Sequence, residues 1–210
     1  MAKKVSSVEY RKSLKVKIVE IAGEMFKQHG FKAVKMDVVA QKLCISKRTL
    51  YEIFPNKEEI IMEAVKMNFE HDREMYEKAM RNNNDLMDVI IELLSLHINE
   101  AKTNSPLLIE ELENYPRVLE FIKNHRKENK DRVYEFMKKG QKEGYFLKNI
   151  NIDLVYEIVN SFLDAILQKA LYKKYSPADI HYTTLMLGMR GICTQKGIEK
   201  IDNLCSKFAE

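Results

Sequence analysis

Apolar residues near the start of the chain recur at the spacing of a single helical face. They occupy positions i, i+4, i+7, i+8, i+11 and i+12, in the order Leu14, Ile18, Ile21, Ala22, Met25 and Phe26. This pattern predicts an amphipathic helix from about Ser7 to His29. Gly30 follows directly, and glycine is the usual residue just beyond a helix C-terminus.

The next two predicted helices are short. One spans about 36–43, and the other spans about 46–53 and begins at Ser46, a residue type that caps helix N-termini. Asn56 caps a longer helix, and Glu59 stands at the position that completes a capping box. Two short helices joined by a tight turn are typical of a helix-turn-helix unit.

The rest of the chain also has helical spacing, with no sustained alternation of a strand and few turn signals among its 7 Gly and 4 Pro. We therefore predict an all-α fold with a three-helix helix-turn-helix domain over residues 1–58 and a helical domain over residues 59–210. The later helices are expected at about 56–80, 85–102, 107–114, 117–140, 153–172 and 178–194, with a terminal piece after Gly197.

Composition narrows the class of protein. With 45% hydrophobic and 31% charged residues, the chain is expected to be globular, and it has no apolar stretch of the ~18 residues that a membrane span needs. Residues 1–10 lack the apolar core of a signal peptide, and three scattered cysteines form neither a disulfide framework nor a zinc motif. We expect a cytoplasmic protein that does not bind membranes.

Charge is distributed unevenly along the chain. Residues 1–60 contain 13 Lys or Arg against 7 Asp or Glu, a net charge of +6, whereas the remainder has a net charge of −2. This asymmetry indicates a polyanion as the partner of the N-terminal part, either nucleic acid or an anionic membrane surface.

The second short helix carries the residues suited to reading DNA. Leu50 and Phe54 are four residues apart and are expected to face the core, which leaves Lys47 and Tyr51 on another face with Arg48 beside them. Arg and Lys suit guanine edges or phosphates. A solvated charged face with no function would have the same composition.

An ordered set of landmarks surrounds this helix, and from Lys17 to Val65 the sequence resembles the DNA-binding segment of the tetracycline-repressor (TetR) family. The resemblance implies a dimer with two DNA-binding heads and a helical body that holds an effector. The landmarks are Ala22-x-x-Met25-Phe26, Gly30-Phe31, Val39-Ala40, Ile45-Ser46-Lys47, Thr49-Leu50-Tyr51, Phe54 and Lys57-Glu58-Glu59.

The resemblance implies base contacts by Lys47 and Arg48 and contacts to the DNA backbone by other residues of the same segment. The complete set of expected DNA-binding residues is Lys35, Ser46, Lys47, Arg48, Thr49, Tyr51 and Lys57. Two positions depart from the family pattern. Lys35 stands where the family has a capping Ser or Thr, and Cys44 stands where the turn usually has Gly. If the turn needs positive φ, Cys44 costs about 1 kcal/mol.

Two other features of the N-terminal part have alternative interpretations. Cys44 is expected to be a small, partly buried thiol, although a redox switch is conceivable beside a DNA-reading unit. The early basic residues form either an arm along phosphates or a solvated tail, and we favour the arm. These residues are Lys3, Lys4, Arg11, Lys12 and Lys15.

In the predicted body, polar residues on partly apolar helices are candidates for binding an effector. They are His97, Glu110, Glu113, Tyr134, Asn160 and Asp164. The helices Asp153–Tyr172 and Ala178–Thr194 are expected to form a two-fold dimer interface. The first is apolar on more than one face, and the second has Gly188 and Gly191 for close approach.

The function predicted from these observations is a ligand-responsive, sequence-specific transcriptional regulator. We expect it to be a repressor that binds a palindromic double-stranded DNA operator as a dimer. The alternative is a helical ligand-binding or adaptor protein without specific DNA binding, and membrane-surface binding is a weaker one. No catalytic constellation, metal-ligand spacing or glycine-rich phosphate loop is present, so we expect no enzyme activity, metal or cofactor.

Overall fold

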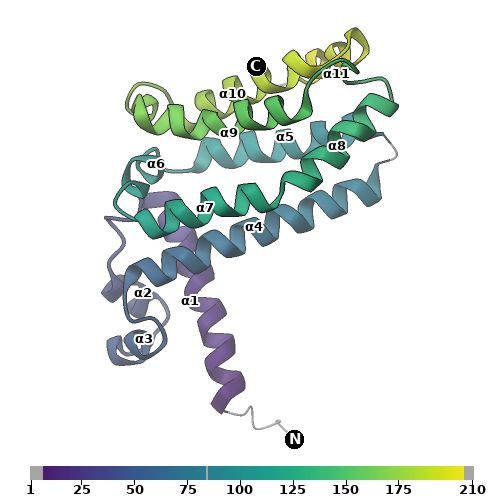
Figure 1. Ribbon diagram of the computed structural model, residues 1–210. Coiled ribbons are helices and arrows are strands. Elements are labelled where there is room, and N and C mark those ends of the chain that lie inside the picture. The colour runs from purple at the N-terminus through teal and green to yellow at the C-terminus, as the bar shows by residue number, and fades with distance from the viewer. Residues whose placement is uncertain (1–6, 84, 206–210) are drawn as a thin grey trace, which may run out of the picture. The chain divides into compact units, whose positions relative to one another are not determined.

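The computed structural model describes residues 7–83 and 85–205, and within them the fold is all-α (Figure 1). Lys3 and Lys4 lie outside the described residues. The helices are α1 (Ser7–His29), α2 (Met36–Lys42), α3 (Lys47–Ile53), α4 (Lys57–Asn82), α5 (Leu86–Thr103), α6 (Leu107–Leu112), α7 (Pro116–Glu128), α8 (Lys130–Lys142), α9 (Ile152–Gln168), α10 (Pro177–Ile192) and α11 (Gln195–Cys205), with a 3₁₀ turn η1 (Leu171–Lys173).

The chain forms two compact units. The first, which we call the head unit, contains residues 1–70 and 104–120. The second, the body unit, contains residues 71–103 and 121–210. The predicted domain boundary at residue 58 stays a prediction. It cuts the chain once, whereas each compact unit combines two separate stretches of the chain.

The caps of the helix-turn-helix segment are confirmed. Ser46 precedes α3 with extended backbone, and its Oγ accepts a hydrogen bond from the Thr49 amide at 3.0 Å. The side chain of Asn56 accepts from the Glu59 amide at 3.0 Å in the same way at the start of α4. Each cap satisfies a backbone N–H that has no partner inside the helix.

The core of the head unit lies between α1, α2, α3 and the start of α4. The predicted faces are confirmed, since Leu50 is 0% and Phe54 is 2% exposed. The other buried apolar residues of this part of the head unit are Leu14, Ile18, Val19, Ala22, Phe26, Phe31, Val34, Val39, Ala40, Ile60 and Ile61. Burial of this many large apolar side chains gives the short α2 and α3 the support that helices of 7 residues lack in isolation.

In the body unit, the start of α11 packs against α5 and the segment after α8. The Tyr145 hydroxyl donates to Asp85, and this bond raises the pKa of Tyr145 to about 12. Lys200 pairs with Asp85 and with Asp88, at 3.2 and 2.8 Å. Phe146, which is fully buried, forms a backbone bridge with Cys193.

Two predicted helix boundaries are wrong. The single helix expected at about 117–140 is divided into α7 and α8 at Asn129, whose side chain donates to the His125 carbonyl at 2.9 Å. The helix expected to reach Tyr172 ends at Gln168, because Ala170 adopts a left-handed conformation with φ of 46°. Neither position is Gly or Pro, so the local turn signals that guided the prediction are absent there.

Candidate nucleic-acid interface

Helix α3 presents a polar face to solvent on the side opposite its buried residues. The side chains of Lys47 and Arg48 are 65% and 89% exposed, and Tyr51 is 48% exposed. Thr49 is half-buried, and its hydroxyl shares a hydrogen bond with Ser46 Oγ at 2.8 Å. A short helix braced on one side and basic on the other has the form of a recognition helix for the major groove.

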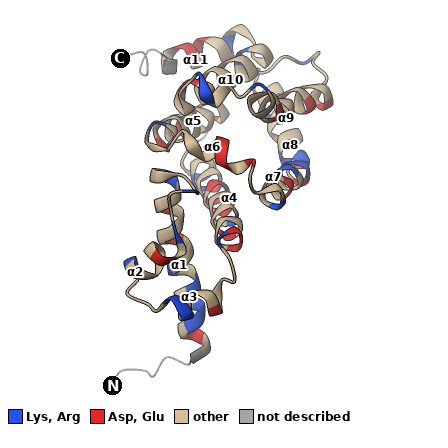
Figure 2. Cartoon of the chain, turned by 90° about the vertical axis from the view of Figure 1, so that its left-hand side faces the viewer, with Lys and Arg blue, Asp and Glu red and all other residues tan. Residues whose placement is uncertain are grey.

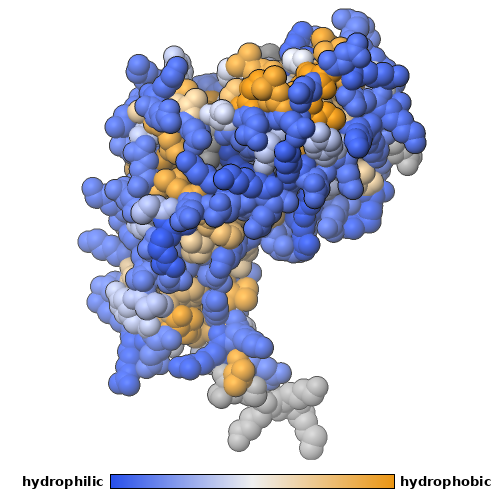
Figure 3. All heavy atoms as spheres, viewed as in Figure 1, coloured by the Kyte–Doolittle hydropathy of each residue, from blue (hydrophilic) through white to orange (hydrophobic). Residues whose placement is uncertain are grey.

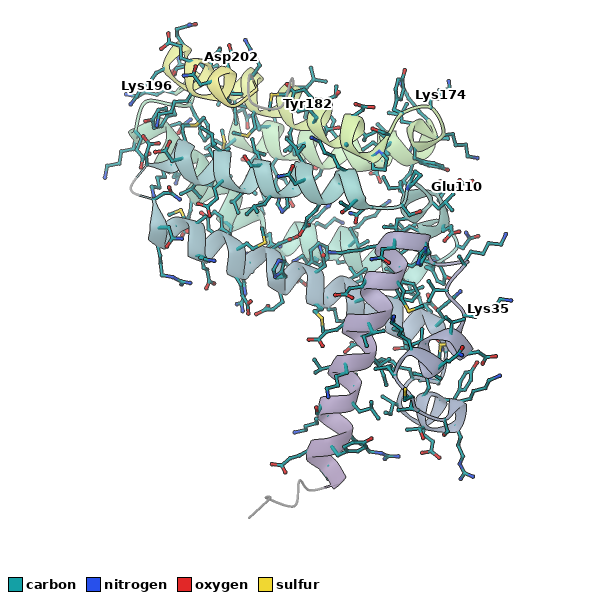
Figure 4. All side chains as sticks on the ribbon, turned by 180° about the vertical axis from the view of Figure 1, so that it is seen from behind. Lys35, Glu110, Lys174, Tyr182, Lys196 and Asp202 are labelled. Atoms are coloured by element: carbon teal, nitrogen blue, oxygen red, sulfur yellow. The ribbon has the colours of Figure 1, made fainter. Side chains whose placement is uncertain are left out.

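The segments before α2 and α3 accommodate the two departures from the family pattern. Lys35 occupies the N-cap position of α2 with extended backbone and makes no side-chain cap bond, and its side chain extends outward (Figure 4). Cys44 keeps positive φ, at 53°, so the turn retains the geometry that glycine usually provides. Our expectation of a partly buried thiol is wrong, because Cys44 is exposed.

Basic and acidic residues both occur along the helices of the head unit (Figure 2). Lys47 Nζ lies 2.5 Å from Asp37, Arg48 Nε lies 2.9 Å from Glu52, and Lys15 Nζ lies 2.9 Å from Glu63. Exposed pairs of this kind contribute about 0–1 kcal/mol each. Their cations are therefore available to phosphates or base edges at little cost.

Lys57 has a different environment from the other expected DNA contacts. Its ammonium group donates to the Phe31 carbonyl at 2.8 Å and to the Val34 carbonyl at 3.3 Å. Burial lowers the pKa of Lys57, and the nearby Glu111 carboxylate opposes that shift. In this structure the amine holds the segment between α1 and α2 through two of its three N–H groups, which leaves one donor for another acceptor.

Glu111 is a residue that sequence reasoning missed. It is 9% exposed, and its Oε2 accepts from the Lys32 amide at 2.6 Å. A side chain at Gly30 would place its Cβ 2.9 Å from the same oxygen, so glycine serves here both for close approach and for its φ of 82°. The buried carboxylate thus joins α6 to the segment that leads into α2.

Further contacts attach residues 104–120 to the same part of the head unit. The Ser105 amide donates to the Lys27 carbonyl at 2.6 Å, and the Tyr115 ring packs edge-on against Phe31 at 5.6 Å. Arg117 pairs with Glu59 at 3.0 Å. The position of the segment that leads from α1 into α2 therefore depends on α6 and its flanking residues, which are distant in sequence.

Of the six effector candidates, Glu110 and Glu113 belong to the head unit and the others belong to the body unit. Glu113 is exposed and Glu110 is half-buried. The Tyr134 hydroxyl donates to Asp153 at 2.8 Å, and the Asn160 amide donates to a backbone carbonyl of its own helix at 3.0 Å. Asp164 pairs with Lys123 at 3.0 Å.

His97, the remaining candidate, is half-buried on α5, with Nε2 3.6 Å from the Asp72 carboxylate. Its interaction with Asp72 raises the pKa of the imidazole above its ordinary value of 6.5, an effect to which Glu100 adds and which burial opposes.

Because the folded-state pKa of His97 is raised, the stability that this group contributes is fully present below pH 6.5 and is lost as the pH rises through the folded-state pKa. We expect the free energy of unfolding of the wild type to fall relative to that of His97→Gln between about pH 6 and pH 8. Urea unfolding of both proteins across this range measures the difference. If the free energies of unfolding of the two proteins changed with pH in parallel, the raised pKa of His97 would be contradicted.

Helices α9 and α10 carry an exposed apolar surface, which we call the α9–α10 face (Figure 3). Leu154 is 58%, Ile158 50% and Leu187 67% exposed. A Cβ at Gly188 would lie 3.7 Å from the Phe162 ring, so α10 meets α9 at ordinary van der Waals distance at this point. Contiguous apolar surface of this kind marks an interaction site.

Residues 18–64 match the family model described as bacterial regulatory proteins, tetR family, and this match confirms the resemblance predicted from the sequence for that segment. No curated protein sequence matches the chain at a significant level.

Solved structures share the fold over nearly the full length of both chains. A protein from Saccharomonospora viridis, described as a transcriptional regulator in complex with choline, has 17% identity over 88% of this chain and 100% of its own, with a TM-score of 0.65. A TetR-family regulator from Cytophaga hutchinsonii has 18% identity over 92% and 100%, with a TM-score of 0.64. The fatty acid degradation regulator FadR from Bacillus halodurans has 18% identity over 83% and 94%, with a TM-score of 0.60.

Among residues 7–83 and 85–205, no helix is long and apolar enough to cross a membrane, and no three His, Cys, Asp or Glu side chains gather where they could hold a metal ion.

Proposed function

We propose that this protein is a homodimeric, cytoplasmic transcriptional repressor that binds a palindromic DNA operator and is released by a small molecule. The observation that carries the proposal is α3, a braced helix whose exposed face bears Lys47, Arg48 and Tyr51. The match of residues 18–64 to the TetR family supports it.

For the DNA contacts, we propose that Lys47 and Arg48 meet base edges, while Lys35, Thr49 and Tyr51 meet phosphates or sugars. Ser46 acts by capping α3 and by its bond to Thr49, which orients the first turn of the recognition helix. For Lys57, whose amine is bonded inside the head unit, we propose a supporting role in place of the backbone contact expected from the family.

The dimer is proposed to form through the α9–α10 face, in agreement with the helices Asp153–Tyr172 and Ala178–Thr194 expected from the sequence. The exposure of Leu154, Ile158 and Leu187 supports this, because a second copy would remove them from water. A two-fold dimer presents two copies of α3 and so favours two half-sites related by a palindrome.

We propose that the effector binds the helical body and shifts the population between two arrangements that differ in the spacing of the two heads. The contacts of Glu111, Ser105 and Tyr115 with the segments around α1 support a role for residues 104–120 in that coupling. Choline bound to the Saccharomonospora viridis protein supports a small-molecule effector as a class, without identifying one.

His97, Tyr134, Asn160 and Asp164 stay proposed effector contacts in the body unit. Each makes the intramolecular bond described above, which an effector would replace or extend. Glu110, on α6, and Glu113, directly after it, also stay proposed effector contacts.

Selection of bound fragments from sheared genomic DNA, at two salt concentrations, tests the proposal. We expect one palindromic sequence enriched at both salts, and light scattering is expected to give the mass of two 24.7 kDa chains. Sequence-blind capture that disappears at the higher salt would indicate electrostatic binding alone and would favour the ligand-binding or adaptor alternative.

Arg48→Ala is expected to weaken operator binding by about 1–3 kcal/mol and to relax selectivity at one base pair of each half-site, because a base contact is lost. Lys47→Ala is expected to do the same at a different base pair. Anisotropy titrations with single-base operator variants measure both effects. An equal loss on every sequence would assign the substituted residue to the DNA backbone.

A further inference from the structure

Glu52 joins two arginines that belong to different helices. Its Oε1 lies 2.9 Å from Arg48 Nε one turn earlier on α3, and its Oε2 lies 3.5 Å from Arg11 Nη2 on α1. The carboxylate side chain is 45% exposed, Arg11 is 65% exposed and Arg48 is 89% exposed. The three side chains form a chain of charges along the reading side of α3, which we call the Arg11–Glu52–Arg48 triad.

The geometry at Arg48 leaves its base-reading edge open. Glu52 takes the Nε–H, whereas both terminal nitrogens have no hydrogen bond to the described residues. Two parallel N–H groups at the end of a guanidinium are the donors that recognise O6 and N7 of guanine. A carboxylate on the side edge of Arg48 therefore directs the guanidinium without occupying the groups that read a base.

An exposed pair at this spacing contributes little in the free protein. In the major groove, however, water is displaced and the local dielectric falls, so a carboxylate that fixes an arginine rotamer has a larger effect. A lone carboxylate there would be repelled by phosphates. Arg11 offsets that repulsion, because with two arginines the triad carries a net charge of +1.

Arg11 lies outside residues 18–64, so this link is not part of the segment matched to the family. The first turns of α1 and helix α3 face each other across a hollow of about 340 Å³. It is lined by Val8, Tyr10, Arg11, Leu14, Thr49, Glu52 and Ile53. The Arg11–Glu52 pair spans the two sides of this hollow and connects the start of α1 to the recognition helix.

We propose that Glu52 is a specificity-determining positioning residue, which holds Arg48 toward a G·C pair of the operator while Arg11 neutralises the carboxylate against the DNA backbone. This inference rests on the proposed function. It assigns to Glu52 a role in selectivity that is distinct from affinity, because Glu52 acts by positioning Arg48.

The test compares Glu52→Ala with Glu63→Ala, a matched control. Glu63 is also a carboxylate of the head unit that pairs with two cations, Lys15 at 2.9 Å and Lys66 at 2.8 Å, so its removal changes the net charge equally. Dissociation constants are measured for the selected operator, for the operator with the G·C pair read by Arg48 replaced, and for scrambled DNA. Circular dichroism establishes that each variant is folded.

For Glu52→Ala we expect the preference for the operator over the replaced site to fall about tenfold, with scrambled DNA bound as tightly as by the wild type or more tightly. Glu63→Ala is expected to change all three dissociation constants by one common factor. In an Arg48→Ala background, Glu52→Ala is expected to leave the preference unchanged, because the two residues act as a unit.

Two results would overturn the inference while leaving the proposed function standing. In the first, the Glu52→Ala protein prefers the operator over the replaced site as strongly as the wild type does. In the second, Glu52→Ala lowers this preference by the same factor whether residue 48 is Arg or Ala. A wild-type protein that prefers no sequence would instead overturn the proposed function itself. A common increase in affinity for all three DNAs, matching that of Glu63→Ala, would show that Glu52 acts only through its charge.

Discussion

Glu111→Ala is expected to lower the free energy of unfolding of the head unit by about 2–4 kcal/mol. The Lys32 amide, which donates to Glu111 Oε2 at 2.6 Å, loses its partner, and the half-buried ammonium of Lys57 loses the carboxylate that opposes the lowering of its pKa. Hydrogen exchange of the Lys32 amide and urea unfolding measure the loss. Glu113→Ala removes an exposed carboxylate next to the same helix and is expected to change stability by less than about 0.5 kcal/mol.

The same substitution is expected to weaken operator binding, because Glu111 holds the segment between Gly30 and Lys32 that leads into α2. Glu111→Gln keeps a side-chain acceptor for the Lys32 amide but removes the charge, so we expect an intermediate loss. A Glu111→Ala protein with the stability and operator affinity of Glu113→Ala would show that the buried carboxylate does not hold the head together.

Gly140→Ala is expected to destabilise the body unit by about 2 kcal/mol or more. The added Cβ would overlap the Phe146 ring, which is 0% exposed. Overpacking of this kind costs about 1–3 kcal/mol and occasionally more, against a gain of about 1 kcal/mol from the helix propensity of alanine. The Phe146 and Leu147 amides are bonded to the Gly140 and Ile192 carbonyls, so the ring has little room to retreat.

Thermal unfolding measures the effect of Gly140→Ala. Gly23→Ala is the control, because its Cβ would meet Ala64 at an ordinary 3.7 Å, and we expect it to be neutral or stabilising. Combining Gly140→Ala with Phe146→Leu is expected to cost less than the sum of the two single substitutions, since the smaller side chain relieves the clash. Simple additivity would contradict the proposed contact.

Much of the candidate DNA interface follows from local sequence. The α3 boundaries depend on the Ser46 cap at one end and on the residues before Pro55 at the other, and both act within one helical turn. The burial of Leu50 and Phe54 follows from their spacing of four, which also determines that Lys47 and Tyr51 face away from the core.

Other features have no local signal. The division between α7 and α8 occurs at Asn129 within a charged stretch that lacks Gly and Pro, and Ala170 ends α9 with a conformation that its residue type does not favour. Gly140 and Gly144 look alike as helix-end signals. In the structure, Gly140 lies inside α8 against Phe146 and Gly144 has the positive φ.

The sequence alone therefore determined the all-α class, the helix-turn-helix segment and the exposed basic face of α3, because caps, periodicity and residue type operate over a few neighbouring positions. Only the tertiary structure decided that Glu111 is buried while Glu110 and Glu113 are not, that Lys57 is bonded to the Phe31 and Val34 carbonyls, and that Glu52 connects Arg11 to Arg48. Each of these features depends on which segment, distant in sequence, packs against the residue. The residue type and its local sequence do not specify that segment.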